Sequence, residues 1–133
     1  MKIINIVMLL VSVTSCMIHP LRAAEPDCSA IETSAQLDNC IHKDTMNSEI
    51  TLVNELKNFE NRVMQLYSAD LALGQEFIAV VREAQNAWLV FRDKSCKIEA
   101  FEIEKDSAAY ITTINNCTLQ MNSKRIEVLN NLL

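Results

Sequence analysis

Residues 85–96 read QNAWLVFRDKSC, and this segment says most about the architecture of the chain. It contains the only tryptophan and one of the five cysteines. Helical spacing of three and four residues puts Gln85, Trp88, Arg92 and Cys96 along one face. An apolar stripe runs beside that face and shares the tryptophan; it consists of Phe77, Val81, Ala84, Trp88 and Phe91. The segment is therefore predicted to be a core helix that also carries half of a disulfide.

Residues 1–24 have the layout of a secretory signal peptide. A basic residue precedes an apolar run from Ile3 to Val13. This run is shorter than the roughly 20 apolar residues that a membrane-spanning helix needs. We therefore predict export to the periplasm or cell envelope, followed by a single helical domain over residues 25–133.

Two routes of signal cleavage stay open. Residues 13–16, VTSC, resemble a bacterial lipobox, in which Cys16 becomes the lipidated first residue. Alternatively, Pro20 breaks the signal helix and an ordinary signal peptidase cuts near Ala23 or Ala24. The exported protein is thus expected to be either lipid-anchored or soluble, and a lipid on Cys16 is the one membrane attachment that the sequence predicts.

Either route leaves four cysteines, and an even number in a small exported chain indicates two disulfides. Of the three connectivities, we expect the local pairs Cys28–Cys40 and Cys96–Cys117. A zinc site is the competing interpretation, and it is disfavoured because the chain has no CxxC motif. No metal site is expected.

The composition indicates an all-α fold. The chain has one glycine and two prolines, and both prolines precede residue 27. Tight turns between strands need these residues, so nearly everything after Cys28 should be helical. The formal net charge of −5 becomes more negative once a signal with its basic residues is removed. Such an acidic domain argues against nucleic acid and anionic lipid headgroups as partners.

The pattern predicts about four helices in an antiparallel bundle. The first runs from Ser29 to about Lys43. Asp44 or Thr45 caps the second, which ends before Gly74, the natural left-handed terminator. The third runs from about Gln75 to about Glu104, and Asp106 or Ser107 caps the fourth. The inward positions are expected to be Ile31, Ala35 and Leu37, then Met46, Ile50, Val53, Leu56, Phe59, Val63 and Leu66, and finally Tyr110 or Ile111, Ile114, Cys117 or Thr118, Met121, Val128 and Leu132.

The last two predicted helices form a hairpin that a disulfide can bridge. Cys96 and Cys117 are equidistant from the predicted cap at residues 106–107. Residues equidistant from the turn of an antiparallel hairpin face one another, so their sulfur atoms can meet. A disulfide that closes a loop of this size contributes about 3 kcal/mol of stability.

The residues that an active site would need are missing from the sequence. His42 is the only histidine beyond the signal, and we interpret it as a surface residue. No nucleophile elbow, phosphate-binding glycine loop or HExxH motif is present. We therefore expect no catalytic residue and no cofactor, and a protein that is not an enzyme.

Two groups of charged residues remain as candidates for a site. Arg92 is close enough to stack on Trp88, and Arg125 on the next helix is expected to approach the same ring. We interpret both arginines as braces of the hairpin in preference to a polar contact surface. A cluster of acids lies at one end of the hairpin, either as a solvated face or as a protrusion that enters a cationic or sugar-binding cleft; its members are Glu99, Glu102, Glu104 and Asp106.

At these residues the chain resembles a known family. The pattern Gln85-x-x-Trp88-x-x-x-Arg92-Asp93-x-x-Cys96, then Cys117 and Arg125-x-x-x-Leu129, is similar to the signature of the LprI-like lysozyme-inhibitor family. These are small exported helical proteins of bacteria. Upstream, Cys28 and the segment Gln36–Cys40 match the first cysteine pair of the family.

The chain departs from that family in two places. A tyrosine that usually follows Leu-Asn early in the second helix is missing, since the chain has Met46-Asn47 and no tyrosine before Tyr67. The glycine-rich connection between the last two cysteines is replaced by the segment Ile103–Ala108. If that connection contacts a partner, the choice of partner differs here.

The resemblance implies a non-catalytic protein that binds and inhibits a lysozyme. An acidic domain suits a cationic lysozyme. The alternative is a structural or interaction module of the envelope with no lysozyme target. The residues that carry the resemblance look like scaffold, so no binding residue is transferred from the family; they are Gln85, Trp88, Arg92, Asp93 and Arg125.

Overall fold

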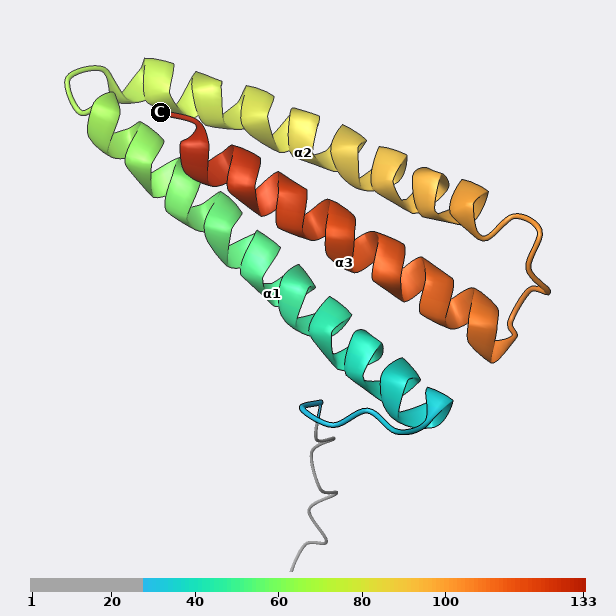
Figure 1. Cartoon of the computed structure of the whole chain (residues 1–133). Helices are drawn as coiled ribbons and strands as arrows, with labels where there is room; N and C mark the ends of the chain where they lie inside the picture. Colours follow the sequence, from blue (N-terminus) through green and yellow to red (C-terminus); the bar gives the residue numbers. More distant parts are fainter. Residues whose placement is uncertain (1–27) are drawn as a thin grey trace, which may run out of the picture.

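Three long helices make up most of residues 28–133, the part of the chain described by the structure, which is a computed structural model. They are α1 (Ser34–Leu66), α2 (Leu71–Glu99) and α3 (Ala108–Asn131). In Figure 1, α2 runs antiparallel to both α1 and α3. The described residues contain no strand, which confirms the all-α class. The prediction of about four helices was wrong by one. The signal peptide and Cys16 lie outside the described residues.

The predicted first and second helices form one continuous helix, α1. It begins at Ser34 rather than Ser29, because Thr33 and Gln36 form a capping box in which each side chain accepts a backbone N–H of the other. Thr45, one of the two expected caps, lies well inside α1. Its hydroxyl is 2.8 Å from the carbonyl oxygen of Ile41 and 2.9 Å from that of Asn115 on α3. A cap-forming residue is tolerated there because its hydroxyl bonds within α1 or to α3.

Gly74 was wrongly predicted to end a helix. It lies in the first turn of α2, whose N-terminus is capped by Asp70 through the N–H of Leu73. The backbone of Gly74 does not have the positive φ of a left-handed terminator. A Cβ at this position would lie 3.0 Å from the Cβ of Tyr67. The glycine therefore allows the ends of α1 and α2 to approach closely.

The hydrophobic core is concentrated near the end where α1 meets α2. Its buried members are Leu52, Phe59, Val63, Ile78 and Leu129. The sequence correctly placed Phe59, Val63 and Cys117 inside. Six further buried residues are polar or charged: Thr45, Ser48, Gln85, Arg92, Thr118 and Asn122.

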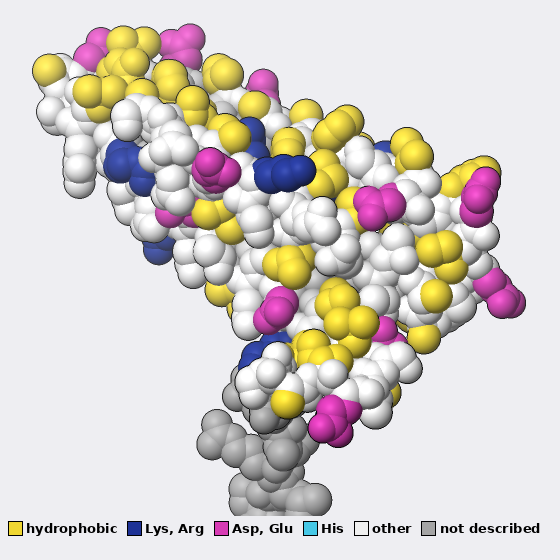
Figure 2. Space-filling model, viewed as in Figure 1, with side chains coloured by type: hydrophobic (Ala, Val, Ile, Leu, Met, Phe, Trp, Pro, Cys, Tyr) yellow, Lys and Arg dark blue, Asp and Glu magenta, His cyan; other side chains and the backbone are white. Residues whose placement is uncertain are grey.

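Many of the predicted inward positions are exposed. They are Ile31, Ala35, Leu37, Met46, Ile50, Val53, Leu66, Ala84, Phe91, Ile111, Val128 and Leu132. A three-helix arrangement buries only a narrow strip of each helix, and polar side chains fill part of that strip here. Figure 2 shows apolar side chains spread over the visible surface as a result.

The expected disulfide pairing is confirmed. Cys28–Cys40 ties the segment before α1 to the second turn of that helix, and Cys96–Cys117 joins α2 to α3. The α2 helix ends at Glu99 rather than near Glu104. Ser107, one of the two predicted caps, begins α3 by accepting the N–H of Tyr110 at 3.1 Å.

Candidate functional site

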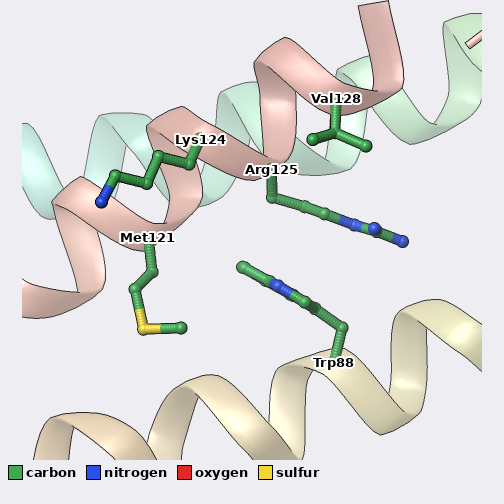
Figure 3. A pocket seen from close by; sticks show the side chains of 5 residues that line it. All are labelled: Trp88, Met121, Lys124, Arg125 and Val128. Carbon is green, nitrogen blue, oxygen red and sulfur yellow. The ribbon is translucent and has the colours of Figure 1, made fainter.

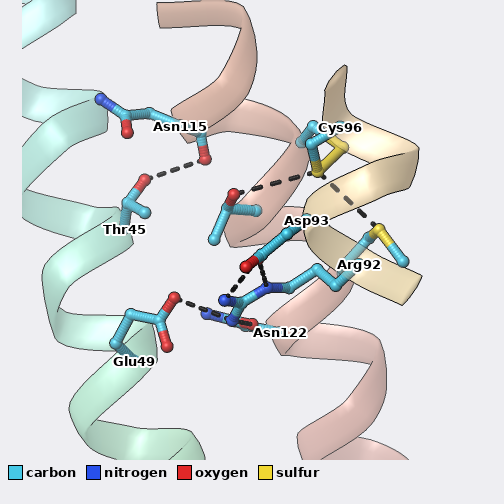
Figure 4. Close-up of a disulfide and its surroundings, with 10 residues drawn as sticks. Thr45, Glu49, Arg92, Asp93, Cys96, Asn115 and Asn122 are labelled. Atoms are coloured by element: carbon cyan, nitrogen blue, oxygen red, sulfur yellow. Dashed lines mark hydrogen bonds and ion pairs between the residues drawn. A yellow bond between two sulfur atoms is a disulfide. The ribbon is translucent and has the colours of Figure 1, made fainter. Parts of the chain in front are cut away.

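Arg92 lies at the centre of a polar cluster that joins all three helices. Its Nη1 atom donates to Glu49 of α1 and to Asn122 of α3, each at 2.8 Å. Its Nε and Nη2 atoms donate to the carboxylate of Asp93 at 3.0 and 2.9 Å. Figure 4 shows this cluster beside the Cys96–Cys117 disulfide. Because two carboxylates face a guanidinium that is 9% exposed, the buried positive charge is compensated.

Asn122 completes this cluster. It is fully buried, and its Nδ2 atom donates to the hydroxyl of Ser48 at 2.9 Å while its Oδ1 atom accepts from Arg92. Both polar ends of the amide therefore have partners on other helices. Such a cluster fixes which faces of the three helices meet, because any rotation of one helix would leave a buried polar group unpaired.

Trp88 contacts both arginines of the sequence motif. The Cζ atoms of Arg92 and Arg125 each lie 5.6 Å from the centroid of its ring. Arg125 also donates from Nε to Oε1 of the buried Gln85 at 2.9 Å. Partial burial lowers the pKa of Arg125 from its ordinary value. The structure thus brings together all five motif residues, and most of their polar atoms bond to one another or to neighbouring helices.

A small cavity opens beside Trp88. Figure 3 shows Arg125 extended alongside the indole, with Met121 and Lys124 at the opposite side of the opening. The cavity has a volume of about 180 Å³, and Val128 completes its lining. Drug-sized ligands usually occupy about 300–1,000 Å³. The lining offers no carboxylate, hydroxyl or imidazole for acid–base chemistry.

The acids predicted at the end of the hairpin lie at one end of the molecule. Glu99 is the last residue of α2, and Glu102, Glu104 and Asp106 lie in the connection to α3. All four are exposed. Phe101 lies among them with 83% of its surface exposed, the largest fraction of any large apolar residue of the described chain. The connection therefore carries an exposed apolar ring with carboxylates on both sides of it in the sequence, and we call these five residues the acidic turn.

The described residues hold no arrangement suited to catalysis by a metal. His42 is exposed on α1. Residues 28–133 contain no group of three or more His, Cys, Asp or Glu side chains that could hold a metal ion. Over the same range, no helix is long and apolar enough to cross a membrane.

The sequence interpretation missed Glu49, Ser48 and Asn122. These residues are polar, and apolar periodicity selects only hydrophobic positions. The one available signal was spacing: Thr118, Asn122, Arg125 and Leu129 recur at intervals of three and four, as one face of a helix does. That face is the one that α3 turns toward the other helices.

Comparisons with known proteins agree with the resemblance noted in the sequence. The family model described as "Lysozyme inhibitor LprI" matches residues 25–129. The crystal structure of a DUF1311 family protein from Pseudomonas putida is similar to this chain at 24% sequence identity, with a TM-score of 0.68. The match covers 77% of this chain and 96% of that protein, and at this identity it shows the fold alone. Among curated proteins, no match is found.

Proposed function

We propose that this chain, which belongs to the LprI lysozyme-inhibitor family, binds a lysozyme and inhibits it without catalysing a reaction. The match over residues 25–129 carries this proposal, because it includes all three helices almost completely. The polar cluster around Arg92 supports a non-catalytic role. The Arg92 guanidinium and the Asn122 amide are held by hydrogen bonds between the helices, as suits a structural role.

We further propose that the protein works outside the cytoplasm, in the periplasm or cell envelope. Two disulfides in a small domain suit an oxidising compartment. The apolar run that precedes the domain suits a signal peptide, with the exported protein either soluble or lipid-anchored through Cys16. Mass spectrometry of the native N-terminus distinguishes the two forms.

The acidic turn is the surface that we propose to contact the lysozyme. Its four carboxylates complement a cationic protein and speed the encounter with it. Phe101 supplies the apolar anchor that interfaces usually need at their centre, because exposed charges by themselves contribute little affinity. The Cys96–Cys117 disulfide near the base of the turn limits its motion, which lowers the entropy lost on binding.

A cell-wall lysis assay tests the function. The purified mature protein is titrated into lysozyme reactions, and lysis should fall as the protein is added. Several lysozyme types are compared, since the choice of partner is open. Unchanged lysis at micromolar excess with all of them would contradict the proposal and favour the alternative, an envelope interaction module without a lysozyme target.

A matched pair of variants tests the surface. In the first, the four acids of the turn are neutralised: Glu99→Gln, Glu102→Gln, Glu104→Gln and Asp106→Asn. In the control, four exposed acids elsewhere are changed in the same way: Glu32→Gln, Glu83→Gln, Glu127→Gln and Asp44→Asn. Both variants lose four negative charges, so only the position differs. Inhibition should weaken about tenfold or more in the first variant alone. If both variants lost inhibition equally, the effect would come from net charge rather than from the position of the acidic turn.

A further inference from the structure

Large apolar side chains stay exposed along one face of α2. Leu73, Val80, Phe91 and Ile98 have 47%, 62%, 62% and 74% of their surfaces exposed. Ala84 and Ala87 are exposed between them. At about 3.6 residues per turn, these six residues fall within a stripe about 60° wide. We call them the α2 stripe.

No other helix of residues 28–133 covers this stripe. The buried residues of α2 include Ile78, Gln85, Arg92 and Cys96, and their mean direction lies about 135° around the helix from the middle of the stripe. In Figure 1, α2 forms one edge of the arrangement, with α3 and α1 on the same side of it. Figure 2 shows apolar side chains along that edge. The stripe is thus a side of α2 that the described fold leaves unpartnered.

The order of side chains in the stripe is symmetric about its middle. The midpoint lies between Gln85 and Asn86. Ala84 and Ala87 are equidistant from it, as are Val80 and Phe91, and so are Leu73 and Ile98. When two copies of such a helix pair antiparallel about a twofold axis, each residue meets the one at the mirrored position. Small residues would then meet at the centre, where the helices come closest, and large ones would meet on both sides.

Two of the charges beside the stripe follow the same symmetry. Glu76 and Lys94 flank it on the same side, at nearly equal distances from the midpoint. Both are exposed, and neither has an ion pair within residues 28–133 as the structure describes them. In an antiparallel pair, Glu76 of one copy lies beside Lys94 of the other, twice per dimer. In a parallel pair about a twofold axis, the two copies of each residue would lie on opposite flanks of the interface, so these charge pairs would not form.

We propose that the α2 stripe is the interface of a symmetric dimer, in which α2 packs antiparallel against α2 of a second copy. The apolar pairs hide side chains that otherwise face water. The two charge pairs select the antiparallel orientation. The two acidic turns then lie at opposite ends of the paired helices, so the proposal is independent of lysozyme binding.

Analytical ultracentrifugation over a wide range of concentrations tests the dimer. The wild-type protein should sediment as a dimer that dissociates on dilution. Val80→Glu, within the stripe, should raise the dissociation constant about 100-fold or more, because each dimer contains the change twice. Val90→Glu is the matched control: Val90 is 61% exposed on the same helix but lies outside the stripe. Circular dichroism verifies that both variants keep their helices.

Charge reversal tests the orientation. Glu76→Lys alone places like charges at both sites and should weaken the dimer about tenfold at low salt. Lys94→Glu alone should do the same, and the double variant should return to within about threefold of the wild type. A wild-type protein that remains monomeric at all concentrations overturns the proposal. So does a dimer that Val80→Glu and Val90→Glu weaken equally, and a double variant without recovery rejects the antiparallel pairing.

Discussion

Replacement of Arg92 by methionine separates the structural role of the Trp88 region from a binding role. Methionine keeps an unbranched apolar stem and removes the guanidinium. The change leaves Oδ1 of the fully buried Asn122 without its donor, which costs about 1–3 kcal/mol. Loss of the ion pair with Glu49 adds at most about 1 kcal/mol, because that carboxylate is 41% exposed. Loss of the contact with Trp88 adds about 0.5–1 kcal/mol.

Together these losses amount to about 3 kcal/mol, a large share of the roughly 5–15 kcal/mol that stabilises a typical domain. Urea unfolding followed by the fluorescence of Trp88, the only tryptophan of the chain, measures the change directly. Asp93→Asn is the control, since its carboxylate is 57% exposed and its loss should cost less than about 1 kcal/mol.

A double-mutant cycle localises the effect. If the orphaned amide of Asn122 causes most of the loss, Asn122→Leu combined with Arg92→Met should destabilise the protein by about 1 kcal/mol less than the sum of the single changes. One result would refute the interpretation of Arg92 as a structural brace. If Arg92→Met changed the unfolding free energy by less than about 1 kcal/mol and abolished lysozyme inhibition, Arg92 would be a contact residue rather than a brace.

Three further outcomes are expected. Replacing both Cys96 and Cys117 by serine opens a loop whose ends are 21 residues apart, and urea unfolding should show that the free energy of unfolding falls by about 3 kcal/mol. If neither the thermal melt nor the peptide map changed, this pairing would be wrong. Gly74→Ala should lower the melting temperature, because the new Cβ would meet the Cβ of Tyr67, an atom attached directly to the backbone. Since alanine favours helices, a rise in the melting temperature would show that α1 and α2 can separate there at little cost. Thr33→Ala removes the cap of α1 and should reduce the unfolding free energy by about 1 kcal/mol. Amide exchange should become faster in the first turn of α1 alone. Faster exchange throughout α1 would indicate that this cap stabilises more than the first turn.

Local chemistry explains which helix ends were predictable. Ser107 was one of two predicted caps because its short side chain can accept an N–H hydrogen bond and an apolar pattern follows it. In the structure, Ser107 caps the N-terminus of α3. Asp44 and Thr45 gave the same local signal, yet α1 continues through both of them. The difference is tertiary: α3 supplies the carbonyl of Asn115 beside the Thr45 hydroxyl, so nothing there requires the helix to end.

Apolar periodicity was a poorer guide to burial than to helix formation. It marked α1 as helical, but four of the seven positions expected inside on its main apolar stripe are exposed, namely Met46, Ile50, Val53 and Leu66. The face that α1 buries includes Thr45 and Ser48, which no hydrophobic scale selects. Their hydroxyls are favourable inside because they bond to carbonyl oxygens of α1 and to partners that α3 brings to them.

The sequence by itself determined the all-helical class, the local pairing of the four cysteines and the family signature, since each depends on residue types and spacings along the chain. The tertiary structure decided the number of helices, the place of Gly74 and the polar cluster around Arg92. These depend on which helix faces meet, and burial of a side chain is favourable only when the neighbouring helix supplies matching shape or a hydrogen-bond partner. For the same reason, the exposure of the α2 stripe became visible only once α1 and α3 were found to cover a different face of that helix.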